Sequence, residues 1–248
     1  MSPIEADDHG QPPNASQPGR DAQRLGVMET GGTSNPGQAD LADRRSDDAI
    51  SDQIELSDVA VQWPTHREST TAGVLMEFVV DKVETPDGTT MIRNYLKHPN
   101  SVGVIALDEA GRVAIERQYR HPVRRKLVEA PAGLCDHDGE DMLQAAQREL
   151  AEELGFEASQ WSILVDVFAT PGCSTQGTRI FLAQGLTSVS RPEGFELEAE
   201  EADMAVGWAD VDAVLDAIYA GRVMNPTLIT GVLALKTAQL TGRVLRTI

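Results

Sequence analysis

The most informative stretch of this sequence is GLCDHDGEDMLQAAQRELAEELGF, residues 133–156. Its second half, 141–154, carries apolar residues near helical spacing and is followed by a glycine, so it predicts a helix that stops there. Glu149 and Glu153 lie four positions apart and therefore share one face of that helix, with Glu152 beside them. The opposite face, which we expect to be buried, consists of Leu143, Ala146, Leu150 and Leu154.

Three carboxylates at this spacing repel one another on a bare helix. A cation among them would explain the cluster. Oxygen ligands, with no cysteine or histidine on the helix, suit Mg²⁺ or Mn²⁺. Taken alone, the same pattern fits a solvated acidic helix face equally well.

The residues around the cluster resemble the box of the Nudix hydrolase family, G-x5-E-x7-R-E-U-x-E-E-x-G-U, where U is a bulky apolar residue. Every specified position is filled here, by Gly133, Glu140, Arg148, Glu149, Leu150, Glu152, Glu153, Gly155 and Phe156. The sequence departs from the pattern in the first spacer, where six residues instead of five separate Gly133 from Glu140. The extra residue falls in the loop before the helix, so we expect the helix geometry to survive.

This resemblance implies a metal site on the helix, with Mg²⁺ or Mn²⁺ as the cofactor. Glu149 and Glu153 would be the main ligands, Glu152 would assist directly or through water, and the backbone carbonyl of Ala132 would be a further ligand. Arg148 would bridge to a helix glutamate and orient it. The metal polarises a pyrophosphate and helps to generate the attacking hydroxide.

Segments outside the box resemble the ADP-ribose pyrophosphatase branch of that family, in its actinobacterial form. They are residues 118–121, 129–133, 169–172, 191–193, 200–204, 207–208 and 225, and the similarity extends over about 75–240. The resemblance implies hydrolysis of ADP-ribose to AMP and ribose 5-phosphate. Two alternatives are another nucleoside diphosphate derivative (a nucleotide sugar, NADH or a dinucleoside polyphosphate) and a nucleotide sensor that does not cleave its ligand.

In that branch a glutamate on a loop after the box acts as general base or positions the water. The match falls on Glu201, with Glu200 as the neighbouring candidate, although both could be solvated loop residues. Arg120 is the candidate clamp for the diphosphate, because its planar fork makes paired hydrogen bonds. Arg125 can add charge, and Glu129 is a candidate for binding the ribose or adenine at the mouth of the site.

Strand patterns dominate the first half of the chain and helices appear later. We expect strands at 74–83, 89–96, 102–107, 113–119, 163–168, 178–183 and 204–208, and further helices around 211–218 and 228–235. This order predicts an α+β fold, a mixed sheet with helices packed on it. The resemblance implies a Nudix fold, a mixed β-sheet sandwiched by helices (α/β/α), with an N-terminal antiparallel β hairpin.

The sequence divides into three regions. Residues 1–57 hold no aromatic residue and many acidic ones, so we expect a disordered acidic tail. Residues 58–98 form an N-terminal β region, in which the resemblance implies a homodimer with exchanged N-terminal strands. Residues 99–248 are the expected Nudix hydrolase domain.

Composition argues against several classes of partner. Twenty-one basic and 39 acidic residues leave a formal net charge of -18, which disfavours nucleic acid and anionic membrane surfaces. We expect no transmembrane helix and no signal peptide. The two cysteines, Cys135 and Cys173, lack metal-type spacing, and we expect free thiols in a cytoplasmic protein.

Overall fold

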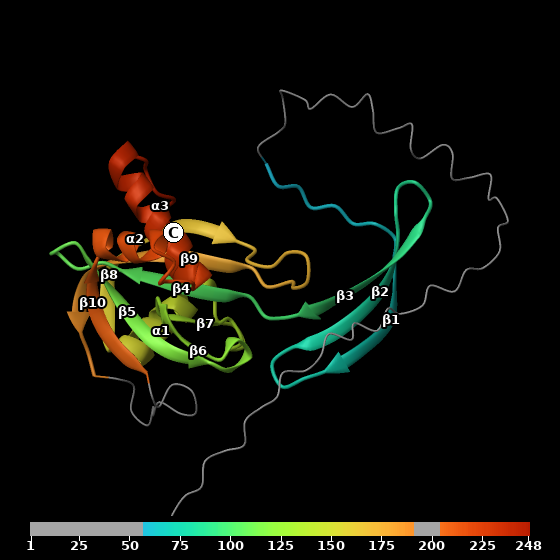
Figure 1. Ribbon diagram of the computed structural model, residues 1–248, viewed down its shortest axis with the longest axis horizontal. Helices are drawn as coiled ribbons and strands as arrows, with labels where there is room; N and C mark the ends of the chain where they lie inside the picture. The colour runs from blue at the N-terminus through green and yellow to red at the C-terminus, as the bar shows by residue number, and fades with distance from the viewer. Residues whose placement is uncertain (1–56, 191–203) are drawn as a thin grey trace, which may run out of the picture. The chain divides into compact units, whose positions relative to one another are not determined.

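The computed structural model describes residues 57–190 and 204–248 (Figure 1). Ten strands, three α-helices and one short 3-10 helix (His121–Val123) are defined within these ranges. The strands are β1 (Thr65–Ala72), β2 (Glu77–Glu84), β3 (Thr90–Lys97), β4 (Ser101–Ala106), β5 (Arg112–Arg120), β6 (Arg125–Glu129), β7 (Ala132–Leu134), β8 (Phe156–Val167), β9 (Thr178–Ser188) and β10 (Ala205–Asp210). The helices are α1 (Met142–Leu154), α2 (Val211–Tyr219) and α3 (Pro226–Thr241).

The strands after β3 form two sheets. One has the order β7-β4-β9-β8 and is mixed, because β4 and β9 run parallel while β7 and β8 pair antiparallel to their neighbours. The other has the order β10-β5-β6 and is antiparallel throughout. The predicted mixed β-sheet is therefore present.

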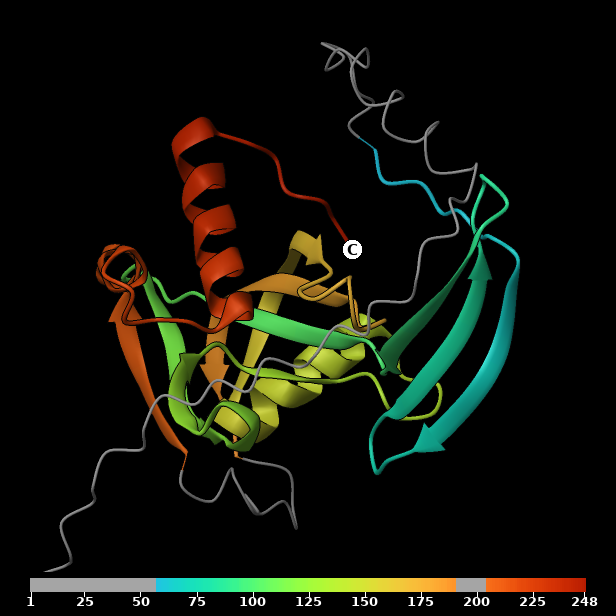
Figure 2. The same ribbon diagram turned by 45° about the vertical axis from the view of Figure 1, so that its right-hand side comes forward.

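Two apolar cores lie on the two faces of the mixed sheet. Alternate residues of one strand point to opposite faces, so Val102 and Val104 of β4 pack with Leu150 of α1. Ile105 of the same strand packs with Leu228 and other residues of α3 on the opposite face. Figure 2 shows the two helices on either side of β4. The expected α/β/α sandwich is confirmed.

The N-terminal region differs from the predicted hairpin by one strand. β2 and β3 form that hairpin, and β1 adds to it as a third antiparallel strand. The sequence of β1, THRESTTA, has no apolar alternation and is exposed throughout, so its pattern could not predict a strand. Asp81 of β2 is buried and accepts hydrogen bonds from Arg67 of β1 and the Tyr95 hydroxyl of β3. This polar cluster ties the three strands together.

The remaining expected elements are present, with β8 and β9 longer than predicted. The first 56 residues of the predicted tail lie outside the described ranges. Within those ranges, no helix is long and apolar enough to cross a bilayer.

Candidate active site

Helix α1 presents the glutamates of the box, and its start is defined by a local hydrogen-bond exchange. The carboxylate of Asp141 accepts hydrogen bonds from the backbone N–H groups of Leu143 and Gln144 at 2.8 and 2.9 Å. The side chain of Gln144 accepts one in return from the N–H of Asp141. This capping box satisfies donors that the first turn leaves without partners. The helix ends at Gly155, whose φ is 68°, as predicted.

Arg148 is the centre of the carboxylate cluster. Its Nε and Nη2 donate to Glu140 at 2.9 and 3.1 Å, and its Nη1 donates to Glu149 at 2.7 Å and Glu152 at 3.0 Å. A fourth partner is the carbonyl of Leu134, which accepts from Nη2 at 3.3 Å. The predicted bridging role of Arg148 therefore extends to three carboxylates.

The Arg148 contacts also have electrostatic consequences. Hydrogen bonds from Arg148 hold the pKa of Glu140 below its usual value, against the opposing effect of burial. In turn, the pKa of Arg148 is raised, chiefly by its hydrogen bonds to Glu140 and also by Glu149 and Glu152. The guanidinium thus stays charged and compensates part of the negative charge on the helix.

The longer first spacer does not separate Glu140 from the helix. The loop contains a turn in which the N–H of Glu140 donates to the carbonyl of His137 at 3.2 Å. Gly139 adopts a φ of 80° in this turn, a conformation that favours glycine. Glu140 consequently reaches Arg148 as described.

Glu149 and Glu153 lie against the strand that precedes the loop. Oε2 of Glu153 accepts a hydrogen bond from the N–H of Ala132 at 3.0 Å, and Glu153 is only 4% exposed. A Cβ on Gly133 would lie 1.8 Å from Oε1 of Glu149, so only glycine leaves room for this carboxylate. The Glu149 and Glu152 side chains are 12% and 18% exposed, which excludes a simple solvated acidic face.

A second charged group lies where β5 and β6 run side by side. Nε and Nη2 of Arg120 donate to the carboxylate of Glu129 at 2.8 to 3.3 Å. Burial alone would lower the pKa of Arg120, but the hydrogen bonds that it donates to Glu129, and the charges of Glu129, Glu116 and Glu153, raise it instead. Glu129 lies three residues before Ala132, whose N–H donates to Glu153, so the Arg120–Glu129 pair and the α1 carboxylates are linked through this short segment.

The two other predicted substrate residues, Glu129 and Arg125, differ from each other in their exposure to solvent. Glu129, which was predicted at the mouth of the site, is buried with 1% of its surface exposed and contacts Arg120. Arg125 is exposed and lies opposite Arg120 in the β5–β6 ladder. Glu200 and Glu201 lie outside the described residues, so the structure does not place the predicted base.

Two buried polar residues of β5 were not singled out from the sequence. Glu116 and Gln118 are 1% and 3% exposed, and because residues two apart in a strand share a face, they lie on the same face of β5 as Arg120. Glu116 lies directly opposite Glu129 on β6. Polar residues two apart in a strand that is otherwise largely buried are the signal that could have identified them.

The donor set can be compared with the needs of a divalent cation. Glu149, Glu152 and Glu153 offer only oxygen atoms, which Mg²⁺ and Mn²⁺ prefer. Among the described residues, no three metal-binding side chains are already arranged around one point. Glu149 and Glu152 instead contact Arg148, and Glu153 contacts Ala132. The chemistry of these oxygen donors, gathered at one end of the helix, still fits a hard cation.

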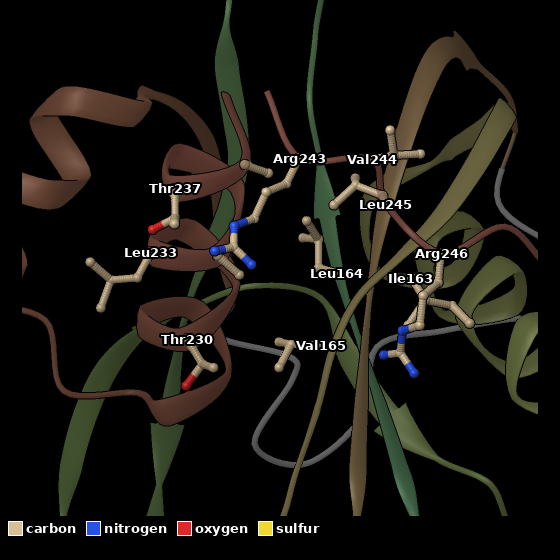
Figure 3. Close-up of a pocket in the computed structure, with 12 residues that line it drawn as sticks. Ile163, Leu164, Val165, Thr230, Leu233, Thr237, Arg243, Val244, Leu245 and Arg246 are labelled. Carbon is tan, nitrogen blue, oxygen red and sulfur yellow. The ribbon is translucent and has the colours of Figure 1, made fainter. Parts of the chain in front are cut away.

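A cavity of about 490 Å³ lies elsewhere, between β8, α3 and the C-terminal segment (Figure 3). Its walls include Leu164 and Leu233, and the Arg243 side chain extends into it. Its lining includes none of the predicted site residues that the structure describes. The two cysteines are both free thiols, Cys135 partly buried and Cys173 exposed. Burial is the main cause of a raised pKa for Cys135, which disfavours a reactive thiolate there.

A glycine loop leading into a glutamate-rich helix, set on an α/β/α sandwich, is the arrangement of a Nudix hydrolase. A family model described as the NUDIX domain matches residues 97–225. The chain belongs to the Nudix hydrolase family, whose members generally need divalent metal ions.

Individual relatives refine this assignment. The chain is 39% identical to an ADP-ribose pyrophosphatase of Mycobacterium tuberculosis, over 67% of this chain and 79% of that protein. It is 32% identical to a methanol dehydrogenase activator of Bacillus methanolicus, over 65% of this chain and 85% of that protein. A crystal structure of an ADP compounds hydrolase superimposes with a TM-score of 0.60 at 20% identity, covering 75% of this chain and all of that chain. This last likeness concerns the fold.

Proposed function

We propose that the chain hydrolyses ADP-ribose to AMP and ribose 5-phosphate in the presence of Mg²⁺ or Mn²⁺. The observation that carries the substrate is the 39% identity to an ADP-ribose pyrophosphatase over most of that protein. The carboxylate cluster around Arg148 supports the chemistry, because it gathers oxygen donors on one helix face.

Each residue of the box has a role in this proposal. Glu149 and Glu153 hold the metal, assisted by Glu152 and the carbonyl of Ala132. When bound, the metal neutralises the diphosphate and lowers the pKa of the attacking water. Arg148 orients the helix carboxylates by the hydrogen bonds described above.

The substrate is held by arginines in the same proposal. Arg120 binds the diphosphate, and Arg125, exposed on the neighbouring strand, adds positive charge. Glu201 accepts the proton of the attacking water or positions that water, with Glu200 as the alternative. The reaction adds one water across the P–O–P linkage, and the two phosphoryl products leave.

The deciding experiment is AMP release from ADP-ribose by the purified chain, with Mg²⁺ or Mn²⁺ and with EDTA. UDP-glucose, NADH and diadenosine polyphosphates should be assayed beside it. We expect metal-dependent cleavage that is strongest on ADP-ribose. Strongest cleavage of another compound would support the proposed metal site but contradict ADP-ribose as the substrate. Binding of a nucleotide without any cleavage would indicate a sensor.

The base is tested by Glu201→Gln, with Glu200→Gln as the matched variant. Loss of a general base lowers the rate by about 10²- to 10⁴-fold. We expect Glu201→Gln to lower kcat to that extent while ADP-ribose still binds. Near-normal turnover of Glu201→Gln, together with a large loss in Glu200→Gln, would assign the base to Glu200.

Another nucleoside diphosphate derivative remains the second candidate substrate. It is supported by a relative from Streptomyces rubellomurinus, 29% identical over 62% of this chain and 72% of that protein, whose name describes hydrolysis of a CMP-linked phosphonate. The substrate panel above separates the two candidates directly.

We further propose that the chain works in the cytoplasm as a homodimer with exchanged N-terminal strands. The sheet of β1, β2 and β3 pairs chiefly within itself and exposes the large apolar side chains of Leu75, Phe78 and Ile92 at and beside its strands. A second copy would cover such a surface. Light scattering of the full chain should give twice the chain mass, and a monomer mass at micromolar concentration would contradict the proposal.

A further inference from the structure

The ion pair between Arg120 and Glu129 uses one particular edge of the guanidinium. Nη2 donates to Oε2 of Glu129 at 2.8 Å, and Nε donates to Oε1 and Oε2 at 3.1 and 3.3 Å. Within the described ranges, Nη1 of Arg120 donates no hydrogen bond. The guanidinium is therefore held from one side and keeps donors available on the other.

The two partners differ sharply in their access to solvent. The side chain of Arg120 is 37% exposed, whereas that of Glu129 is 2% exposed. A ligand can therefore reach the guanidinium, but Glu129 lies beneath it. Glu129 lies opposite Glu116 in the β5–β6 ladder, four positions from Arg120, so the arginine side chain extends along the strand pair to reach the carboxylate.

A buried carboxylate in this place can orient the arginine before any ligand arrives. A free arginine side chain samples many rotamers, and fixing it on binding would cost conformational entropy. The hydrogen bonds to Glu129 remove that cost in advance. They also leave Nη1 of a fixed, partly exposed guanidinium without a partner among the described residues, and such a planar donor edge suits phosphate oxygens.

We propose that Glu129 is a positioning residue, which holds the Nε–Nη2 edge of Arg120 so that Nη1 is presented to the diphosphate of the substrate. This role replaces the ribose or adenine contact expected from the sequence. The inference rests on the proposed function in one respect, namely that a diphosphate binds at Arg120.

The test measures diphosphate binding separately from turnover. The probe is α,β-methylene-ADP, a diphosphate that cannot be cleaved at its bridge, titrated by calorimetry into the full chain with Mg²⁺. We expect Glu129→Gln to raise Kd about tenfold, since the neutral amide makes weaker and fewer bonds to the guanidinium. KM for ADP-ribose should rise to a similar extent while kcat changes little.

A double-variant comparison separates positioning from direct contact. If Glu129 acts through Arg120, then Glu129→Gln has no further effect on Kd once Arg120→Ala is present. An equal additional loss in that background would show that Glu129 itself touches the ligand and would overturn the inference. An unchanged Kd in the single variant would overturn it as well.

Two controls keep the result interpretable. Asp166→Asn removes another arginine-bound carboxylate, which pairs with Arg179 and Arg246 outside the site, and should leave Kd unchanged. Glu129→Asp keeps the charge but shortens the side chain, so it should also raise Kd. This variant takes the place of Glu129→Gln if the latter does not fold. If the wild type binds the probe but does not cleave ADP-ribose, the proposed function fails and this inference is still tested. Absence of probe binding by the wild type would overturn the inference alone.

Discussion

Gly133 lies directly beneath the carboxylate of Glu149, where the side chain of any other residue would compete for the same space. A Cβ there would approach Oε1, Cδ and Cγ of Glu149 within 1.8, 2.1 and 2.7 Å. These atoms form the outer part of a flexible side chain, which can move aside at little cost to the fold. The conflict therefore concerns the position of the proposed metal ligand more than folding.

We expect Gly133→Ala to lower kcat by about 100-fold, because catalytic groups displaced by about 1 Å lose rates of that order. The free energy of unfolding should change by less than about 1 kcal/mol. Steady-state kinetics and urea unfolding measure the two effects. Gly207→Ala, which adds the same methyl group where no atom lies within 4 Å, should leave activity intact. Equal activity of the two variants would reject the steric argument.

At the scale of elements, α1 depends on its first turn. Asp141 makes two hydrogen bonds to backbone N–H groups and lies next to Glu140, which binds Arg148. We expect Asp141→Ala to lower the free energy of unfolding by about 1 kcal/mol, the usual cost of losing an N-cap. Urea unfolding measures this value. Asp141→Asn keeps the acceptor oxygen and should recover most of the loss, whereas equal losses would contradict a capping role.

The turn between β2 and β3 is expected to be sensitive to acid. Hydrogen bonds from Thr85 and Thr89 lower the pKa of Asp87 from 3.8 to about 2. Because the folded pKa lies below the unfolded one, the carboxylate stabilises the turn above about pH 4, and this contribution is lost as the pH falls toward 2. The Tm of the wild type should therefore fall more steeply over that interval than the Tm of Asp87→Asn.

Thermal unfolding followed by circular dichroism at several pH values provides the measurement. Glu109→Gln is the matched control, because Glu109 is exposed and makes no side-chain hydrogen bond within the described residues. It should keep the wild-type slope. Parallel slopes for the wild type and Asp87→Asn would contradict the assignment of this acid sensitivity to the turn.

The elements also show where the sequence pattern was insufficient. The helix at 142–154 was predicted within one residue, because its apolar spacing and closing glycine are local signals. β1 was not predicted, because its side chains are polar and exposed on both faces. It forms by pairing with β2, and this pairing depends on residues elsewhere in the chain, including the Arg67–Asp81 contact.

At the scale of the whole molecule, the acidic tail is expected to be dispensable for catalysis. Deleting residues 1–50 should leave kcat/KM for ADP-ribose and the oligomeric mass unchanged, since this segment offers little apolar surface to bury. Kinetics and light scattering on the truncated and full chains provide the test. A large loss of turnover or of the dimer would assign the tail a function.

The sequence by itself determined the box, its helix and the family, because these depend on residue type and spacing over a short stretch. It also singled out Arg120, Arg125 and Arg148 as candidate site arginines. Only the tertiary structure decided their partners. Arg148 binds three carboxylates at once, and Glu129 lies buried under Arg120, since strand pairing brings β5 and β6 together. Burial and hydrogen-bond partners depend on contacts between distant segments, which residue spacing alone does not specify.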